Sequence, residues 1–230
     1  MSARFCDRTE AGQRLAQRLA AYANRSDVVV LGLPRGGVVV AYEIARALNT
    51  ALDIFGVRKL GVPNHRELAF GAIATGGIQV LNPDVLRWLG ASDRAIQRVI
   101  DQELQELQRR EQVYRGNRPL PNLCDRTVIL VDDGIATGAT VRAAISGIRT
   151  RHPKEMIVAV PVVPAPTYET LITEVDRLVC LATPKTLHSI SAWYEDFSQV
   201  SDAEVRQLLS MADAPSASGS RAPPATPLQA

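Results

Sequence analysis

The sequence predicts a doubly wound α/β fold, with a mainly parallel five-stranded sheet and helices on both of its faces. Apolar runs of strand length alternate along the chain with segments in which apolar residues recur at helical spacing. The runs are rich in Val, Ile and Leu, which is typical of parallel strands that are buried on both sides. With 230 residues, of which 46% are apolar, the chain can bury a core of this kind.

The first part of the chain predicts a helix followed by a βαβ unit. Leu15, Leu19 and Tyr22 recur at helical spacing within residues 9–23, which predicts an amphipathic helix. The elements expected after it are a strand over 28–33, a helix from Gly36 to about Leu48, and a strand over 52–57.

The middle of the chain predicts an appendage to the sheet. Residues 59–68 contain Gly61, Pro63 and Asn64 with little apolar periodicity, which predicts an exposed loop. Residues 69–74 and 78–81 flank a Gly-rich turn and predict a hairpin. Ser92 can cap a long helix that reaches Tyr114, and we expect this helix to pack along the domain or against a second subunit.

The rest of the chain returns to the α/β alternation. The strands are expected over 128–131, 156–162 and 177–181, and the helices over 139–149, 167–174 and 202–211. We therefore expect a core over 25–185, with the hairpin and the long helix inserted at about 69–116. The terminal segments 1–24 and 186–211 flank this core, and residues 212–230 form an Ala/Pro/Ser tail that we expect to be disordered.

Charge and cysteine content argue against several classes of partner. The chain has 26 Lys and Arg against 24 Asp and Glu, far from the strongly basic surface typical of nucleic-acid binding. The three cysteines are far apart, without a C-x-x-C pair, so we expect them to be reduced. Since no apolar run is long enough for a signal peptide or a membrane span, we expect a cytoplasmic protein.

The densest functional pattern is the run Val128–Thr140, VILVDDGIATGAT. Asp132 and Asp133 fall at the carboxyl end of the expected strand, where open α/β sheets place their ligands. Gly134 and Gly138 allow successive N–H groups to converge on one phosphate at the start of the next helix. Two acids beside a phosphate site suit a ribose diol with a nearby Mg²⁺, so the pattern predicts a sugar phosphate ligand.

This run resembles the signature by which type I phosphoribosyltransferases bind phosphoribosyl pyrophosphate (PRPP). The resemblance implies that Asp132 and Asp133 contact the ribose hydroxyls and that Mg²⁺ arrives with PRPP, with the same two acids as candidate ligands. It also implies that the 5′-phosphate is held by Ile135, Ala136, Thr137, Gly138 and Thr140. Gly134 and Ala139, which belong to the same Gly-rich loop, are further candidate substrate-binding residues. The alternative is an acidic turn before a Gly-capped helix that binds no ligand.

A second strand end, LGLPRGG, places Arg35, Gly36 and Gly37 at the start of a helix. The backbone N–H groups and the positive end of the helix dipole favour an anion, and Arg35 can bind its oxygens in a fork. By the same resemblance, this is the loop that holds the pyrophosphate, and the family often has a non-proline cis peptide there. The alternative is an ordinary turn between strand and helix.

Arg58 and Lys59 begin a segment that resembles the mobile catalytic loop of the family, which closes over PRPP and excludes water. The alternative is that both are solvated loop charges. His65, Arg66 and Glu67 follow in the same segment and are candidates without an assigned role.

The family also has a variable hood, built from terminal segments, that selects the acceptor. Here the material for a hood is residues 5–20 and 189–197, and Trp193, Tyr194 and Phe197 could stack on a planar base. The alternative is that these aromatic residues only attach the C-terminal segment to the core.

Together these features predict an enzyme that transfers the 5-phosphoribosyl group from PRPP to a nitrogen heterocycle and releases pyrophosphate. Arg35, Arg58, Lys59, Asp132 and Asp133 are the expected catalytic residues. We expect a homodimer whose partners are PRPP and a small heterocyclic acceptor. The alternative is a PRPP-binding sensor without catalysis, because a fold does not fix a function.

Overall fold

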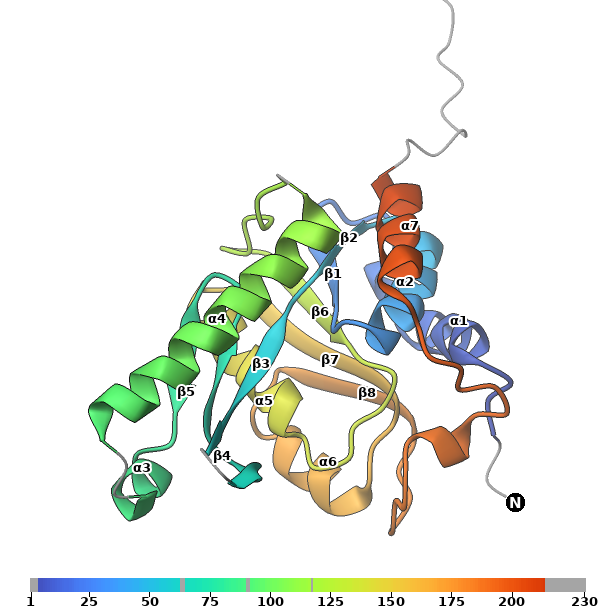
Figure 1. Cartoon of the computed structure of the whole chain (residues 1–230). Coiled ribbons are helices and arrows are strands. Elements are labelled where there is room, and N and C mark those ends of the chain that lie inside the picture. Colours follow the sequence, from blue (N-terminus) through green and yellow to red (C-terminus); the bar gives the residue numbers. More distant parts are fainter. Residues whose placement is uncertain (1–3, 63–64, 90–91, 117, 214–230) are drawn as a thin grey trace, which may run out of the picture.

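The structure is a computed structural model of the chain, and it describes residues 4–62, 65–89, 92–116 and 118–213. Its strands form two sheets, one of five strands and one of three (Figure 1). The five-stranded sheet lies between helices, while the three-stranded sheet lies beside it with the long helix α4 across one of its faces.

The five-stranded sheet is parallel throughout and has the strand order β2-β1-β6-β7-β8. Its strands are β1 (Val28–Gly32), β2 (Ala51–Ile54), β6 (Thr127–Val131), β7 (Glu155–Val162) and β8 (Arg177–Ala182). Every residue of β1 and β6 is buried, as the continuous apolar runs require for strands covered on both faces. The predicted fold class is confirmed.

Helices cover both faces of this sheet. One face carries α1 (Arg8–Arg18), the short helix η1 (Ala20–Tyr22), α2 (Gly36–Leu48) and α7 (Asp202–Asp213), and the other carries α5 (Ala139–Arg149) and α6 (Ala165–Leu171). The pleat of β1 shows why there are two layers: Val28 and Val30 pack into the first cluster, and Val29 and Leu31 into the second. From residue 214 onward, the expected disordered tail lies outside the described residues.

The exposed loop predicted over 59–68 is wrong, because the chain forms strands there. β3 (Val57–Val62), β4 (His65–Ala74) and β5 (Ile78–Leu81) form an antiparallel sheet, and Leu60, Val62 and Phe70 are fully or almost fully buried in it. Gly61 marks a register shift between β3 and β4, so the glycine read as a loop signal is a bulge in a strand. Pro63 and Asn64 lie outside the described residues.

Smaller differences concern the ends of elements. The strand expected over 52–57 is divided, since β2 ends at Ile54 and β3 begins at Val57. The helix expected over 167–174 is α6, which begins and ends earlier. A short helix, α3 (Pro83–Leu89), and the turn η2 (Ser191–Trp193) were not expected.

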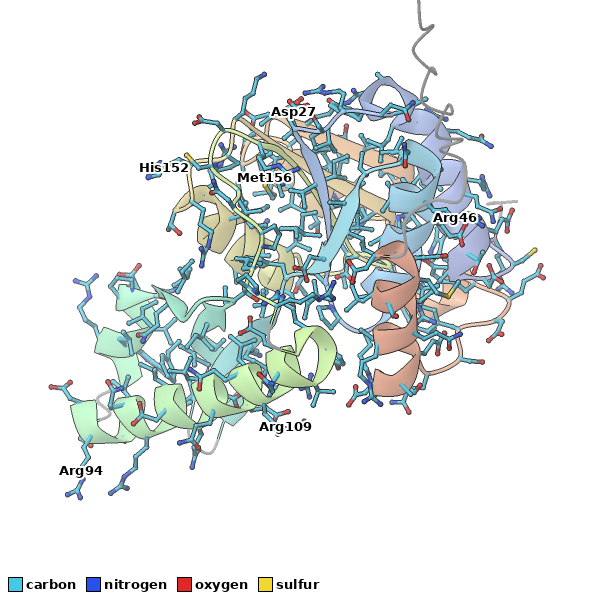
Figure 2. All side chains as sticks on the ribbon, turned by 90° about the horizontal axis from the view of Figure 1, so that it is seen from above. Asp27, Arg46, Arg94, Arg109, His152 and Met156 are labelled. Atoms are coloured by element: carbon cyan, nitrogen blue, oxygen red, sulfur yellow. The ribbon has the colours of Figure 1, made fainter. Side chains whose placement is uncertain are left out.

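The long helix α4 (Asp93–Arg115) begins where the sequence predicts. The Ser92 side chain accepts a hydrogen bond from the N–H of Ala95 at 3.3 Å, which is the predicted N-cap. Ile100 and Leu107 are buried against β3 and β4, whereas Arg94 and Arg109 point away from the sheet (Figure 2). The helix thus packs along the domain through one apolar stripe.

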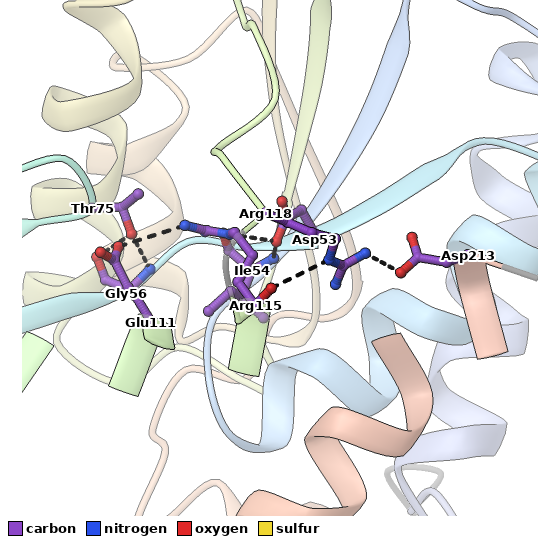
Figure 3. Close-up of polar contacts among 8 residues, drawn as sticks. All are labelled: Asp53, Ile54, Gly56, Thr75, Glu111, Arg115, Arg118 and Asp213. Carbon is purple, nitrogen blue, oxygen red and sulfur yellow. Dashed lines mark hydrogen bonds and ion pairs between the residues drawn. The ribbon is translucent and has the colours of Figure 1, made fainter. Parts of the chain in front are cut away.

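A buried ion pair joins the end of α4 to the main sheet (Figure 3). Arg115 donates through Nε to Oδ1 of Asp53 at 3.0 Å and through Nη2 to the carbonyl of Ile54 at 2.9 Å. Both side chains are at most 10% exposed. Since Asp53 belongs to β2, this pair fixes the inserted unit against the edge of the five-stranded sheet.

Other surface features follow the sequence. His152 and His188 are exposed, and the three cysteines are free. Within the described part of the chain, no helix combines the length and the hydropathy that a bilayer crossing needs.

Candidate active site

The loop between β6 and α5 (Thr127–Val131 and Ala139–Arg149), together with the first two residues of α5, gives residues 134–140, the first half of the candidate site. α5 begins directly after Gly138, whose φ of 79° lies in the left-handed region that favours glycine. The exposed members of the loop are Ala136, Thr137, Ala139 and Thr140. Exposed amides and hydroxyls at a helix N-terminus are suited to bind an anion.

Ile135 differs from its neighbours in this loop. Its N–H donates to the carbonyl of Val162 at 2.9 Å, and its side chain is buried. The hydroxyl of Thr167 donates to the carbonyl of Ala136 at 2.9 Å, which ties the loop to α6. The amide of Ile135 is therefore used within the fold, and the amides available to a phosphate start at Ala136.

The two acids at the end of β6 lie together and are partly buried. The N–H of Asp133 donates to Oδ1 of Asp132 at 2.9 Å, and Nε of Arg8 donates to Oδ2 of Asp133 at 2.8 Å. Burial, and then the charge of Asp133, raise the pKa of Asp132. Burial also raises the pKa of Asp133, although the hydrogen bond from Arg8 opposes this shift. The ionised pair is thus incompletely compensated and favours a ligand that supplies hydroxyls or a cation.

The loop between β1 and α2 forms the second half. The peptide bond before Arg35 is cis, a feature that the family resemblance implies. A Cβ on Gly36 would lie 1.9 Å from Oδ2 of Asp133, and one on Gly37 would lie 2.8 Å from Cα of Asp132. Because only glycine allows so close an approach, the two loops that the sequence predicts separately lie in contact with each other.

Arg35 lies beside Asp202 of α7, which also accepts a hydrogen bond from the end of α4. Its Nη1 lies 3.8 Å from Oδ1 of Asp202 on α7, and the same oxygen accepts a hydrogen bond from the Tyr114 hydroxyl at 2.6 Å. Burial, followed by the hydrogen bond to Asp202, raises the pKa of Tyr114 to about 12, so the hydroxyl stays a neutral donor. The pair of Arg35 with Asp202 is more than a third exposed and contributes little, so Arg35 can turn to an anion.

Arg58 and Lys59 point to opposite faces of β3, because side chains alternate along a strand. Arg58 forms an ion pair with Glu103 of α4, with Nη2 2.6 Å from Oε2. Lys59 is exposed and lies on the same face as Val57, which packs on the cluster that contains α5. The structure therefore separates the two cations that the sequence grouped together. His65, Arg66 and Glu67 belong to β4, and their side chains lie outside the described part.

The aromatic residues near the C-terminus pack largely on one another. Tyr194 is 4% exposed, and its hydroxyl donates to the carbonyl of Asp133 at 2.5 Å. Its ring lies 5.4 Å from that of Phe5 and 5.0 Å from that of Phe197. At 4% exposure the Tyr194 ring is not accessible to a base in this structure, and its contacts fit the alternative that it attaches the C-terminal segment to the core. Trp193 and Phe197 are half-buried.

Arg8 is a site residue to which no sequence motif pointed. It lies in the first turn of α1, after the N-cap Asp7, and its partner Asp133 is 125 positions away. A pattern of neighbours along the chain cannot reveal such a pair. Its proximity becomes visible only when α1 packs beside the two loops.

Comparison with known proteins agrees with this geometry. The chain matches the phosphoribosyl transferase domain family over residues 7–186. It is 46% identical over 208 residues to a protein of Mycobacterium tuberculosis, found in two strains, that carries a provisional phosphoribosyl transferase name. That match covers 90% of this chain and 47% of the relative, so the chain spans about half the length of the curated relatives it matches.

A solved structure has the same fold, and this chain covers almost its whole length. The crystal structure of the protein TT1426 from Thermus thermophilus is similar to this chain with a TM-score of 0.78 and 42% identity. The similarity covers 90% of this chain and 97% of the other. From the joined loops, the match over residues 7–186 and these relatives, it follows that the chain belongs to the phosphoribosyl transferase domain family.

Proposed function

We propose that this chain binds PRPP with Mg²⁺ and transfers the 5-phosphoribosyl group to a nitrogen of a planar heterocycle, with release of pyrophosphate. The observation that carries this proposal is the contact of Gly36 with Asp133. It joins a phosphate loop and a pyrophosphate loop into one anion site with two acids between them. PRPP has its phosphate, its ribose diol and its pyrophosphate in that order.

Each part of the site has a role in this reaction. The amides and hydroxyls from Ala136 to Thr140 hold the 5′-phosphate, and Asp132 and Asp133 accept the ribose hydroxyls. Arg35, with the amides at the start of α2, stabilises the negative charge that develops on the departing pyrophosphate. The displacement at the anomeric carbon needs no covalent nucleophile from the protein.

Mg²⁺ fits this site as an ion that the substrate carries. Asp132 and Asp133 supply carboxylate oxygens, which Mg²⁺ prefers. Among the described residues, those of this site included, no group of three or more His, Cys, Asp and Glu side chains could hold a metal ion. When bound, the ion would help to neutralise the pyrophosphate charge.

The acceptor is proposed to enter between the phosphate loop and the C-terminal segment. Trp193 and Phe197 keep part of their surface exposed and are the remaining candidates to contact its ring. One face of Phe197 is covered by Arg8, whose Cζ lies 3.8 Å from the ring centroid. Trp193 is therefore the better candidate for stacking.

A panel of free bases tests the transfer. Purine, pyrimidine and pyridine bases are each incubated with the protein, PRPP and Mg²⁺, and pyrophosphate release is measured. We expect release with one class of base, and none when Asp132→Asn and Asp133→Asn are combined. PRPP binding without release for any base would instead support the sensor.

Replacing Lys59 by Ala is expected to slow turnover more than it weakens PRPP binding. The exposed Lys59 cation can stabilise charge that develops in the transition state, and such a contact changes kcat more than the dissociation constant. Steady-state kinetics and calorimetry on Lys59→Ala measure the two effects. The matched control is Lys154→Ala, an exposed lysine before β7. Equal kcat in Lys59→Ala and wild type would remove Lys59 from the mechanism.

For the cellular setting we propose a cytoplasmic homodimer of nucleotide metabolism that does not handle nucleic acid. The near balance of 26 basic and 24 acidic residues supports the last part of this proposal. The apolar stripe of α4 is used within the chain, so the dimer would form through other surfaces.

A further inference from the structure

Arg8 lies where the two halves of the site meet. Its side chain is 10% exposed, and Nε donates to Oδ2 of Asp133 at 2.8 Å. A Cβ built on Gly36 would lie 2.7 Å from the same Nε, so the guanidinium also borders the pyrophosphate loop. One cation from the N-terminal helix therefore touches both loops.

The C-terminal segment holds this guanidinium from the other side. Nη1 of Arg8 donates to the carbonyl of Ser198 at 2.9 Å, and Cζ lies 3.8 Å above the ring of Phe197. These contacts use the two directions that a planar guanidinium offers, its edge for hydrogen bonds and its face for an aromatic ring. The orientation of Arg8 is thus fixed by residues far from it in sequence.

Asp133 is held at a second point by the same segment. The hydroxyl of Tyr194 donates to the backbone carbonyl of Asp133 at 2.5 Å. The N–H of Phe5 donates to the carbonyl of Trp193 at 2.8 Å, and the N–H of Glu195 donates to the carbonyl of Phe5 at 2.8 Å. The two terminal segments are therefore joined to each other, and together they hold the side chain and the main chain of Asp133.

We propose that Arg8 is a positioning residue for PRPP: it fixes the Asp133 carboxylate in the orientation that receives the ribose hydroxyls, and it joins the two terminal segments to the substrate loops. This inference rests on the proposed function. Arg8 acts through Asp133, because one of the two adjacent carboxylates needs a counter-charge to stay ionised and ordered in a partly buried place. A guanidinium suits this task better than an ammonium, since it can bind the carboxylate, the Ser198 carbonyl and the Phe197 ring at once.

A double-mutant cycle on Arg8 and Asp133 tests the inference. The variants are Arg8→Met, Asp133→Asn and their combination, and the dissociation constant of PRPP with Mg²⁺ is measured by calorimetry beside the melting temperature. We expect Arg8→Met to weaken binding roughly 10- to 100-fold in the wild-type background, the cost of one charged hydrogen bond. In the Asp133→Asn background we expect Arg8→Met to change binding less than about threefold, because the group it orients is gone.

Two further variants keep the test decisive. Arg8→Lys retains the charge and should recover part of the lost affinity; it also serves if Arg8→Met does not fold. Arg14→Met is the matched control, since Arg14 is another arginine of α1 that pairs with an acid and lies over an aromatic ring, 5.0 Å from the centroid of Phe5. Its PRPP affinity should equal that of the wild type.

The outcomes separate this inference from the proposed function. If wild-type protein binds PRPP, and Arg8→Met weakens binding equally with and without Asp133, Arg8 is only a structural residue and the inference is overturned. Unchanged affinity in both Arg8→Met and Arg8→Lys overturns it as well. If the folded wild type binds no PRPP, the proposed function itself fails.

Discussion

Replacing Asp132 and Asp133 together by asparagine is expected to weaken binding of PRPP with Mg²⁺ by at least about a hundredfold. Each carboxylate is proposed to accept a hydrogen bond from the ribose, and a hydrogen bond to a charged group contributes about 1.5–3 kcal/mol, so two such bonds correspond to a factor of about 10² or more. The amide oxygen of Asn still accepts, but it lacks the charge. Calorimetry on the double variant measures the loss directly.

Replacing Asp132 by Asn should not lower the stability of the unliganded protein. Because burial and the charge of Asp133 raise the pKa of Asp132, its ionised form is disfavoured in the folded state at neutral pH. Asp132→Asn removes this penalty and keeps the acceptor for the N–H of Asp133, so its melting temperature should equal or exceed that of the wild type.

For the loss of PRPP affinity in the double variant, the matched control is Asp101→Asn on the exposed face of α4, which should keep full affinity. Wild-type affinity in the double variant would remove both acids from the site.

Replacing Arg115 by Leu is expected to destabilise the protein by about 3–5 kcal/mol, the cost of leaving a buried charge without its partner. Asp53 is buried and accepts a hydrogen bond from Nε of Arg115 at 3.0 Å, so in the variant its carboxylate would stay buried without this cation. Since small domains are stable by about 5–15 kcal/mol, such a loss is a large part of the total. Denaturant unfolding followed by circular dichroism gives the change in the free energy of unfolding.

Two variants give this prediction its controls. Arg109→Leu changes an arginine of the same helix that is 57% exposed, and should change stability by less than about 0.5 kcal/mol. Combining Arg115→Leu with Asp53→Leu removes both charges and should recover much of the loss, because a buried pair can be replaced by apolar residues. A cost below about 1 kcal/mol for Arg115→Leu alone would show that the pair is not buried as described.

The five-stranded sheet could be predicted because each of its strands has a recognisable pattern within its own stretch of sequence. Each is a run of Val, Ile and Leu that a parallel strand covered on both faces requires, and each is followed by a helix with its own periodicity. The three-stranded sheet could not be predicted to the same extent. Leu60 and Val62 become buried only because α4 packs on them, and that helix begins some 30 residues later. The glycine between them gave a turn signal that tertiary packing overrides.

The candidate site also has one part that the sequence predicts and another that it does not. The loops proposed to hold the phosphate and the pyrophosphate are contiguous segments, so the order of Asp, Gly and Thr residues points to each of them, and the structure then shows that they touch. Arg8 and Tyr194 meet Asp133 from 125 and 61 positions away. A single sequence gives no sign that residues so far apart along the chain are in contact. The direction of the Tyr194 ring likewise depends on packing with Phe5, which no local pattern encodes.

Titration calorimetry of the wild-type chain with PRPP in the presence of Mg²⁺ tests the central claim most directly. The site formed by the Asp132–Thr140 and Arg35–Gly37 loops predicts saturable binding of one PRPP per chain, and loss of that binding in the double variant of Asp132 and Asp133. A folded wild-type protein that shows no saturable binding at millimolar PRPP would contradict the account.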